Sequence, residues 1–184
     1  MTRIQKKPPP NWFAAFAIEP TAAMRAWLDT IAENAPLGVV FFKPMDLHIT
    51  VAFFGALSSE QVPVLLQTIG KIAFSPFSIE FGETRALPSR KRFSALTLTL
   101  GKGRDKVAKM MGEHESSLLA LVGKRSRRSP LPHMTFARPK KRSDGEILSW
   151  LDQLNPPDCS VIIKEITMYT RSDNRRQSLF KRVN

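Results

Sequence analysis

Two of the three histidines in this 184-residue chain begin the same tripeptide, His-x-Thr, at His48–Thr50 and at His133–Thr135. Side chains two residues apart in a strand point to the same face, so each tripeptide puts an imidazole beside a hydroxyl. An imidazole, with an ordinary pKa of about 6.5, can give or take a proton near neutral pH. Two of them could flank one phosphorus, one deprotonating the attacking oxygen and the other protonating the leaving oxygen.

The two threonine hydroxyls, Thr50 and Thr135, could donate hydrogen bonds to the non-bridging phosphate oxygens, whose charge grows in the transition state. This chemistry needs no metal, and the sequence offers no compact set of His, Asp and Glu ligands. The single cysteine, Cys159, excludes an internal disulfide and a thiolate cluster. We therefore expect neither a metal nor a cofactor. A Ser-His-Asp triad is unsupported, since no nucleophile elbow lies near either histidine.

A lone histidine in such a strand is more often structural than catalytic, and the third histidine illustrates this. His114 falls on an apolar helical stripe with Met111 and Leu118, which is typical of a partly buried helix residue. His48 and His133 differ from it, because they occupy equivalent places in two similar segments. That repetition favours a catalytic pair.

The hydrophobic pattern predicts alternating strands and helices, typical of an α+β fold. A capping box at residues 58–61 begins the second helix, whose apolar stripe runs from Val62 to Ile72. The predicted strands cover 12–18, 39–42, 46–54, 76–86, 92–100, 132–138, 159–169 and 177–183, and the other predicted helices cover 21–33, 103–123 and 144–152.

The order of these elements suggests an internal repeat. Strand 12–18, helix 21–33 and strand 47–54 carry the first His-x-Thr, and strand 92–100, helix 103–123 and strand 132–138 carry the second. A duplicated unit would place the two motifs across a pseudo-twofold axis, so that distant histidines face each other. Strict alternation puts Phe54 on the face of His48, and Ile49, Val51 and Phe53 on the opposite face.

The formal net charge is +12, and residues 1–70 hold equal numbers of basic and acidic side chains. The whole excess therefore follows residue 70, which indicates a polyanionic partner, with nucleic acid the first candidate, or else a solvated basic surface. Three basic stretches could hold the phosphates of a nucleic acid: 90–92, which begins with Arg90, 124–128 and 138–142. Phe54 and Tyr169 are candidates for stacking on bases.

No segment directs the chain to a membrane. The apolar run 12–18 is too short to span a bilayer and is not followed by a cleavage site. Residues 1–10 are basic and then proline-rich, and we expect a flexible tail there. With a single cysteine, a reducing cytoplasm is the expected location.

The paired motifs and their flanks resemble the two-histidine phosphoesterase superfamily. Within it, the chain is similar to the LigT-like RNA 2′,3′-cyclic phosphodiesterases, historically called 2′-5′ RNA ligases. The resemblance covers about residues 12–170. It rests, besides the motifs, on the opening strand 13–18, on Asp46-Leu47 and Phe53-Phe54-Gly55 around the first motif, on Pro132 and Ala137-Arg138 around the second, and on the loop 87–92.

The resemblance implies one bilobal domain, residues 11–184, with two antiparallel sheets around a central cleft and helices outside. We expect a monomer. It implies that a terminal RNA 2′,3′-cyclic phosphate is opened to a 2′-phosphate, with weak 2′-5′ ligase activity in the reverse direction. His48 would be the general acid, His133 the base, and Arg138 a phosphate ligand. Strict alternation would place Arg138 on the other face of the strand from His133, unless a bulge or a strand end follows Ala137.

Two alternatives stay open from the sequence. The same site could act on small cyclic nucleotides or on 2′-5′ oligonucleotides instead of longer RNA. The scaffold could also be a non-catalytic RNA-binding module, although both histidines and both threonines are present.

Overall fold

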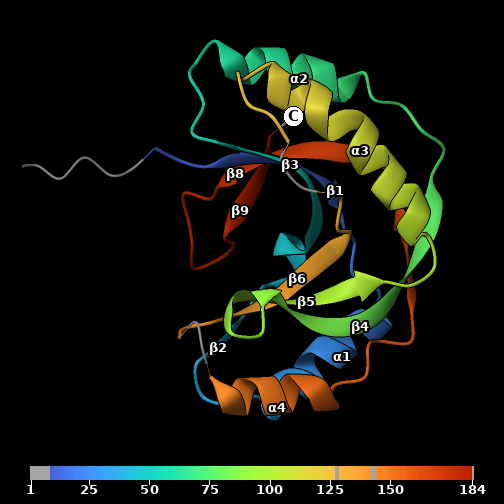
Figure 1. Ribbon diagram of the computed structural model, residues 1–184, viewed down its shortest axis with the longest axis vertical. Coiled ribbons are helices and arrows are strands. Elements are labelled where there is room, and N and C mark those ends of the chain that lie inside the picture. Colours follow the sequence, from blue (N-terminus) through green and yellow to red (C-terminus); the bar gives the residue numbers. More distant parts are fainter. Residues whose placement is uncertain (1–8, 127–128, 142–143, 184) are drawn as a thin grey trace, which may run out of the picture.

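The computed structural model describes residues 9–126, 129–141 and 144–183, which form an α+β fold (Figure 1). A short 3₁₀ turn covers Pro44–Asp46. In chain order the helices and strands are β1 (Trp12–Ala17), α1 (Ala22–Glu33), β2 (Val39–Phe41), β3 (His48–Gly55), α2 (Gln61–Gly70), β4 (Phe77–Ser89), β5 (Arg92–Leu100), α3 (Arg104–Ala120), β6 (His133–Pro139), α4 (Gly145–Gln153), β7 (Ser160–Ile163), β8 (Ile166–Arg171) and β9 (Phe180–Val183).

The strands form two antiparallel sheets. Sheet 1 has the order β3-β1-β8-β9, and sheet 2 has the order β2-β6-β5-β4-β7. Read from the strand that begins with a motif histidine, the orders are β3-β1-β8-β9 and β6-β5-β4-β7. Each motif strand therefore pairs with the first strand of its own repeat, and β2 is an addition beyond β6. This arrangement confirms the predicted bilobal fold with pseudo-twofold symmetry.

Polar side chains set the start of two helices. Thr21 Oγ1 accepts a hydrogen bond from the Met24 backbone N–H at 3.2 Å, which caps α1. The Asp144 carboxylate accepts from the backbone N–H groups of Glu146 and Ile147 and caps α4. At α2 the Ser58 N–H donates to Gln61 Oε1 at 3.0 Å, which is one half of the expected capping box.

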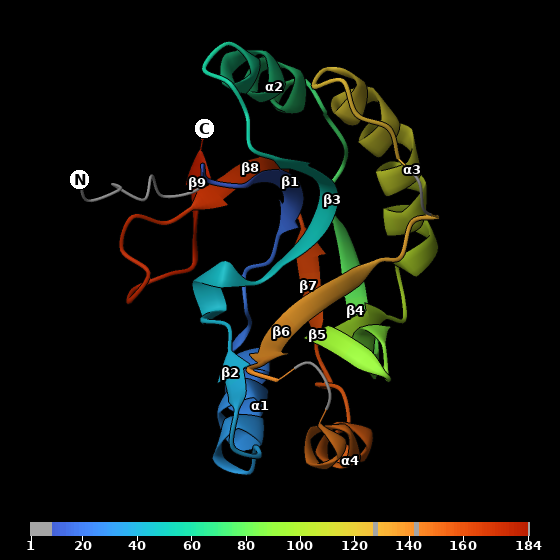
Figure 2. The same ribbon diagram turned by 60° about the vertical axis from the view of Figure 1, so that its left-hand side comes forward.

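Each repeat contributes its helix to the opposite lobe. Helix α1 lies under sheet 2, where the Trp27 ring packs edge-on against Phe136 of β6 at 5.3 Å between centroids. Helix α3 instead contacts β3 of sheet 1. Figures 1 and 2 show α2 above sheet 1, α3 along the side of β3, and α1 and α4 at the lower end with sheet 2. A single large apolar core joins the elements of both lobes.

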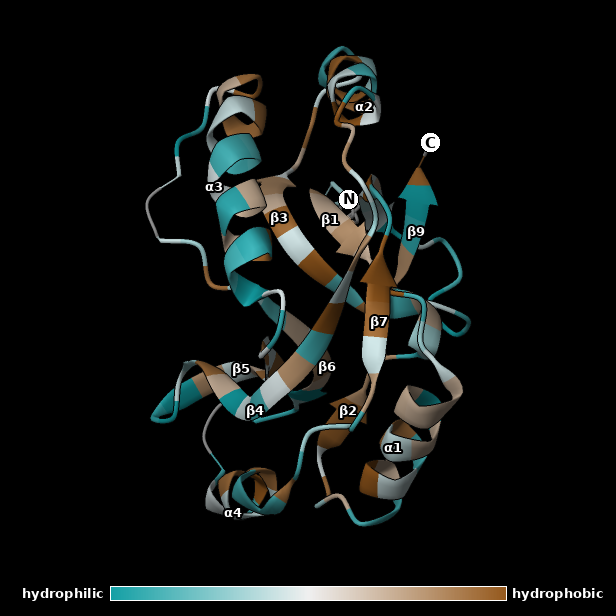
Figure 3. Ribbon diagram, turned by 90° about the vertical axis from the view of Figure 1, so that its right-hand side faces the viewer, coloured by the Kyte–Doolittle hydropathy of each residue, from teal (hydrophilic) through white to brown (hydrophobic). Residues whose placement is uncertain are grey.

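The lobes consequently do not divide the chain at residue 70. Sheet 1 takes β8 and β9 from the C-terminal end, and sheet 2 takes β2 from the first half. The basic side chains that follow residue 70 are thus spread over both lobes. The edge strand β9 alone carries Lys181 and Arg182, which make it hydrophilic in Figure 3 and protect its open edge from pairing.

The predicted strand 159–169 is wrong as a single strand, because it divides between the sheets. Strand β7 pairs with β4 of sheet 2, and β8 pairs with β1 of sheet 1. The break falls at Lys164 and Glu165, which are both exposed, and Lys164 Nζ reaches Glu19 at 2.9 Å. Two charged side chains in an otherwise apolar run mark the point where the chain crosses from one core face to another.

Most of the expected N-terminal tail, residues 1–8, lies outside the described residues, as do residues 127–128 of the basic stretch 124–128. Among the helices that the structure describes, none is long and apolar enough to cross a membrane.

Gly103, which precedes α3, has a left-handed φ of +81° and lies against β4. A Cβ there would come within 2.8 Å of Ile79 Cγ2 and 3.0 Å of the Ser78 carbonyl oxygen. We expect Gly103→Ala to lower the unfolding free energy by about 2 kcal/mol or more, from backbone strain and overpacking. Urea denaturation measures this change.

Gly70→Ala is the matched control, because a Cβ at Gly70 would meet no atom within 4 Å. It should be neutral, or stabilising by up to about 1 kcal/mol. Equal effects of the two substitutions would contradict the strain at Gly103.

Candidate active site

A β-bulge aims the side chains of β3. His48 pairs with Ala17 of β1 and Thr50 with Ala15, while Phe53 pairs with Phe13. Val51 is the extra residue, so the alternation shifts by one after Thr50. His48, Thr50 and Phe53 therefore share one face of sheet 1.

The second motif strand has an irregularity at the equivalent place. His133 pairs with Thr99 of β5 and Thr135 with Thr97, but the next pair is Ala137 with Leu96, which leaves Phe136 as the extra residue. The shift brings Arg138 to the face of His133 and Thr135. From the sequence we expect a bulge or a strand end after Ala137, and the observed irregularity lies one residue earlier, at Phe136. Arg138 and Phe53 are thus equivalent positions, five residues after each histidine.

The expectation that Phe54 shares the face of His48 is wrong. Phe54 is fully buried in the main core, and its neighbour Phe53 is 55% exposed. The bulge at Val51 is the reason, since it exchanges the faces of Ala52 and Phe53, and a second shift in register leaves Phe54 itself as an extra residue. Phe53, which sequence alternation assigned to the core, is the ring available to a ligand.

Each motif histidine makes the same hydrogen bond. His48 Nδ1 lies 2.6 Å from the carbonyl oxygen of Asp46, and His133 Nδ1 lies 2.7 Å from the carbonyl oxygen of Leu131. A carbonyl only accepts, so each Nδ1 carries the proton that it donates. The neutral ring then has its lone pair on Nε2, which is the atom left for a substrate.

His48 is buried among three aromatic rings, with centroid distances of 4.7 Å to Phe13, 5.5 Å to Tyr169 and 5.4 Å to Phe180. The pKa of His48 is lowered to about 4, mainly by burial and also by the charges of Arg138 and His133, which together outweigh the hydrogen bond to Asp46. The free site therefore holds His48 as the neutral base form.

Tyr169 does not present a ring to the solvent, so its expected role in stacking on bases is wrong. It is 1% exposed and stacks on Phe13, with 5.2 Å between ring centroids and 6° between ring planes. It pairs with Phe13 across β8 and β1, next to the strand of His48. Tyr169 supports the buried side of the imidazole.

Asp46 positions His48 through a backbone hydrogen bond, a role that the sequence analysis did not predict. Its fully buried carboxylate accepts hydrogen bonds from the backbone N–H groups of Leu179, at 2.8 Å and 3.0 Å, and of Phe180, at 3.1 Å. Its carbonyl receives the proton of His48 Nδ1. The signal was a carboxylate two residues before the histidine, in a segment where every other side chain up to Gly55 is uncharged.

A cavity of about 620 Å³ brings the two motifs together. Thr50 of β3 and His133 of β6 line it, and so does Phe53. Helix α3 contributes Met111 and Glu115, and the remaining walls come from Val51 and from residues 87–88, 94–95 and 129–131. Two strands from different sheets thus open onto one space, and much of its lining is apolar.

Basic side chains gather on another side of the histidines. The guanidinium of Arg138 lies 5.0 Å from the ring centroid of Phe42. Loss of hydration, and then the like charge of Arg175, lower the pKa of Arg138, although the side chain is still exposed. Lys43 Nζ donates to the carbonyl of Arg176, which fixes the loop 172–179 beside the 3₁₀ turn. No ion pair with a carboxylate joins Arg138 or Arg175 within the described residues.

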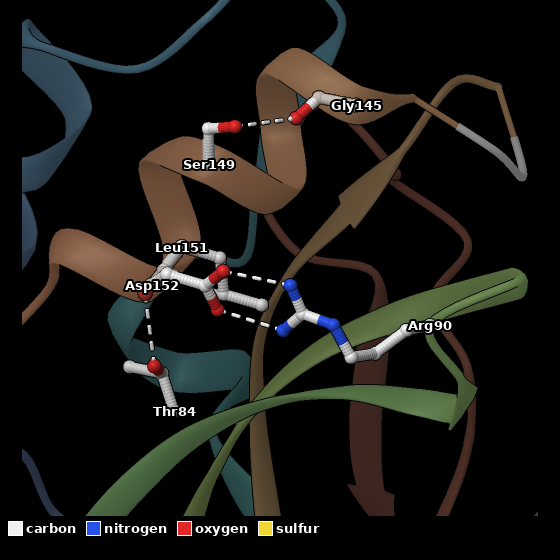
Figure 4. A network of polar contacts seen from close by, with 6 residues as sticks. All are labelled: Thr84, Arg90, Gly145, Ser149, Leu151 and Asp152. Carbon is white, nitrogen blue, oxygen red and sulfur yellow. Dashed lines mark hydrogen bonds and ion pairs between the residues drawn. The ribbon is translucent and has the colours of Figure 1, made fainter.

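Arg90, expected to bind substrate, is engaged elsewhere. Its two terminal nitrogens each lie 2.7 Å from an oxygen of Asp152 in α4, as Figure 4 shows. The pair raises the pKa of Arg90 and lowers that of Asp152. Because both side chains are more than half exposed, this pair contributes little to stability. It joins the β4–β5 hairpin to α4 and leaves no free guanidinium for RNA at this position.

His114 is half-buried on α3 and lines a different hollow, together with Phe74 and Lys106. It takes no part in the pair, as its place on an apolar stripe indicated. Within the described ranges, no three His, Cys, Asp or Glu side chains lie close enough to hold a metal ion.

Comparison with known proteins now places this site in a family. Residues 19–175 match the 2′-5′ RNA ligase superfamily. The chain belongs to the 2′-5′ RNA ligase superfamily. An RNA 2′,3′-cyclic phosphodiesterase of Bacillus subtilis (strain 168) is 33% identical over 120 residues. That match covers 62% of this chain and 64% of the relative, so it spans somewhat less than two thirds of the relative's length.

Solved structures of LigT from E. coli share the fold. The LigT complex with 3′-AMP has a TM-score of 0.69 at 23% identity and covers 96% of both chains. The complex with NADP⁺ has a TM-score of 0.68 at 20% identity, over 97% of this chain and 96% of LigT. A protein of Thermus thermophilus, TT0787, has a TM-score of 0.64 at 19% identity, over 95% of both chains. These likenesses confirm the expected architecture for this member of the superfamily.

The buried His48 should make the stability of this superfamily member depend on pH. The unfolded chain protonates this histidine near pH 6.5, whereas the folded protein does so near pH 4. Between these values the unfolded state binds more protons, so the unfolding free energy falls as the pH is lowered from about 6.5 to about 4. We expect a loss of roughly 2–4 kcal/mol over this window, measured by urea denaturation at a series of pH values.

His48→Gln should remove that part of the pH dependence, and an unchanged dependence in the variant would contradict the assignment. If the variant does not fold, NMR titration of the wild-type imidazole answers the same question. A His48 pKa near 6.5 would then overturn it.

Proposed function

We propose that this protein is a metal-independent RNA 2′,3′-cyclic phosphodiesterase. Water attacks the phosphorus of the terminal cyclic phosphate, and the bond between phosphorus and O3′ breaks. The proton of the water goes to one histidine, and O3′ receives a proton from the other. The product is a 2′-phosphate with a free 3′-hydroxyl. A 5′-hydroxyl in place of water would give 2′-5′ ligation.

The observation that supports this proposal best is the matched pair of imidazoles. Both donate from Nδ1 to a carbonyl two residues earlier, so both leave Nε2 for the substrate. They come from two sheets, and Thr50 beside His48 lines the same cavity as His133. The match to the B. subtilis RNA 2′,3′-cyclic phosphodiesterase also supports the reaction class.

In the proposed hydrolysis His133 is the base and His48 is the acid. The low pKa of His48 in the free site opposes this role, because an acid must carry its proton. A bound phosphate reverses the balance. One negative charge about 4 Å away contributes roughly 4 kcal/mol at an effective dielectric constant near 20, or about 3 pKa units. Substrate binding would thus bring the pKa of His48 from about 4 to near neutrality.

The remaining groups would bind the phosphate. Thr50 and Thr135 would donate hydrogen bonds to its non-bridging oxygens, which gain charge in the transition state. Arg138 shares the face of His133 because of the bulge at Phe136, so its guanidinium would pair with the same phosphate.

Removing either imidazole should abolish most of the turnover. We expect His48→Ala and His133→Ala each to lower kcat by roughly 10²–10⁴-fold on an oligonucleotide ending in a 2′,3′-cyclic phosphate. Identification of the product by chromatography should give the 2′-phosphate, and EDTA should not change the wild-type rate.

His114→Ala is the matched control, since His114 lines a different hollow, and it should keep the wild-type rate. Unchanged turnover in both pair variants would refute the mechanism. RNA binding without product in the wild type would instead support the non-catalytic module.

RNA, rather than a small cyclic nucleotide, is the proposed substrate, and Arg138 with Arg175 would bind its phosphates. Their like charges lie close together without a carboxylate partner in the described residues, and an anion between them would stabilise both.

Arg175→Ala should therefore weaken binding of a single-stranded oligonucleotide and reduce the slope of log K against log[salt] by about 0.7. Fluorescence anisotropy across salt concentrations measures both effects. Arg90→Ala is the control and should leave the slope unchanged, because Arg90 is held by Asp152. A flat salt response of the wild type would favour a small substrate.

A further inference from the structure

One carboxylate lines the cavity that would receive an anionic substrate. Glu115 of α3 shares the lining with Thr50 and His133. A negative charge there repels phosphate. The carboxylate of Glu115 is therefore suited to a different part of the substrate, one that donates hydrogen bonds. The Ser126 hydroxyl donates to Glu115 Oε2 at 2.8 Å. No ion pair with a basic side chain is formed by Glu115 among the residues that the structure describes.

The rest of that wall suits a flat, mostly apolar group. Phe53 presents a ring that is 55% exposed, and Met111, Pro130 and Leu131 lie around the same space. A planar ring system could stack on Phe53 while its edge reaches the carboxylate. At about 620 Å³ the cavity is within the range of pockets that hold small ligands.

One cavity thus holds two kinds of lining groups. Thr50 and His133 suit the cyclic phosphate, and Phe53 and Glu115 suit a planar group that offers hydrogen-bond donors. In a nucleoside 2′,3′-cyclic phosphate the base is attached to the same ribose as the phosphate. The geometry points to Glu115 as the residue that selects the terminal base of the RNA, an inference that rests on the proposed function.

The chemistry of the carboxylate decides which base it selects. An ionised carboxylate only accepts hydrogen bonds, and the bonds it accepts are strong. Guanine offers two adjacent donors, N1–H and the N2 amino group, which match its two oxygens. Adenine and cytosine each offer one amino group beside an acceptor nitrogen. Uracil has a single N–H between two carbonyl oxygens, which the carboxylate repels. The order of preference is therefore guanine first and uracil last.

The test compares kcat/KM for the four nucleoside 2′,3′-cyclic phosphates in the wild type and in Glu115→Gln. We expect the wild type to favour guanosine over uridine by roughly 10-fold or more, the contribution of one charge-assisted hydrogen bond. Glutamine keeps the length and an acceptor for Ser126, but it places an amino donor in the cavity. The variant should lose the guanosine preference and gain relative activity on uridine.

Glu113→Gln is the matched control. Glu113 is two residues away on the same helix, lines a different hollow and lies 3.8 Å from Lys109, so its substitution should leave the order of preference unchanged. Ser126→Ala tests whether Glu115 acts only by holding the loop that follows α3. If this variant reproduces the loss of base preference, the selection is indirect and the inference is wrong.

The other outcomes are equally distinct. An equal loss on all four substrates in Glu115→Gln, or a wild type without base preference, overturns the selection by Glu115 and leaves the proposed function standing. A wild type that hydrolyses none of the four, nor an oligonucleotide with the same end, overturns the proposed function itself.

Discussion

The hydrogen bond from each histidine Nδ1 to the carbonyl two residues earlier is the constraint on which the site depends. It fixes the tautomer, so that Nε2 of His48 and of His133 carries the lone pair. At the first motif the same residue, Asp46, holds the imidazole through its carbonyl and the start of β9 through its carboxylate. The C-terminal strand and the first histidine are therefore positioned together, which explains why a chain end far away in sequence belongs to this lobe.

Two bulges determine what else faces the cleft. Each comes one residue after the motif threonine, at Val51 and at Phe136, and each shifts the alternation by one. The first brings Phe53 out of the core, and the second brings Arg138 to the face of the second histidine. The pseudo-symmetric lobes thus present different side chains at equivalent positions, an aromatic ring on one and a cation on the other. The cleft therefore has an aromatic side and a cationic side. A terminal nucleotide likewise has a base on one side and a phosphate on the other.

Burial and charge then act in opposite directions on the histidine pair. Burial among aromatic rings, together with the nearby cation Arg138, lowers the pKa of His48 to about 4. In the proposed function, the same cation would attract the phosphate whose charge restores the proton. His48 would then be a neutral base in the empty site and an acid once an anion binds, so that substrate charge and catalytic protonation would be coupled by electrostatics.

The sequence by itself determined the catalytic candidates and the order of elements, because motif residues two apart share a strand face and apolar periodicity records which faces are buried. It also indicated the pseudo-repeat. Only the tertiary structure showed that Phe54 and Tyr169 are buried and that Arg90 is paired with Asp152. A bulge depends on the partner strand, burial of a ring depends on packing across β1 and β8, and Arg90 meets Asp152 from a distant helix. Likewise, the basic second half spreads over both lobes because sheet pairing is non-local, and local sequence patterns do not record which distant strand becomes the neighbour.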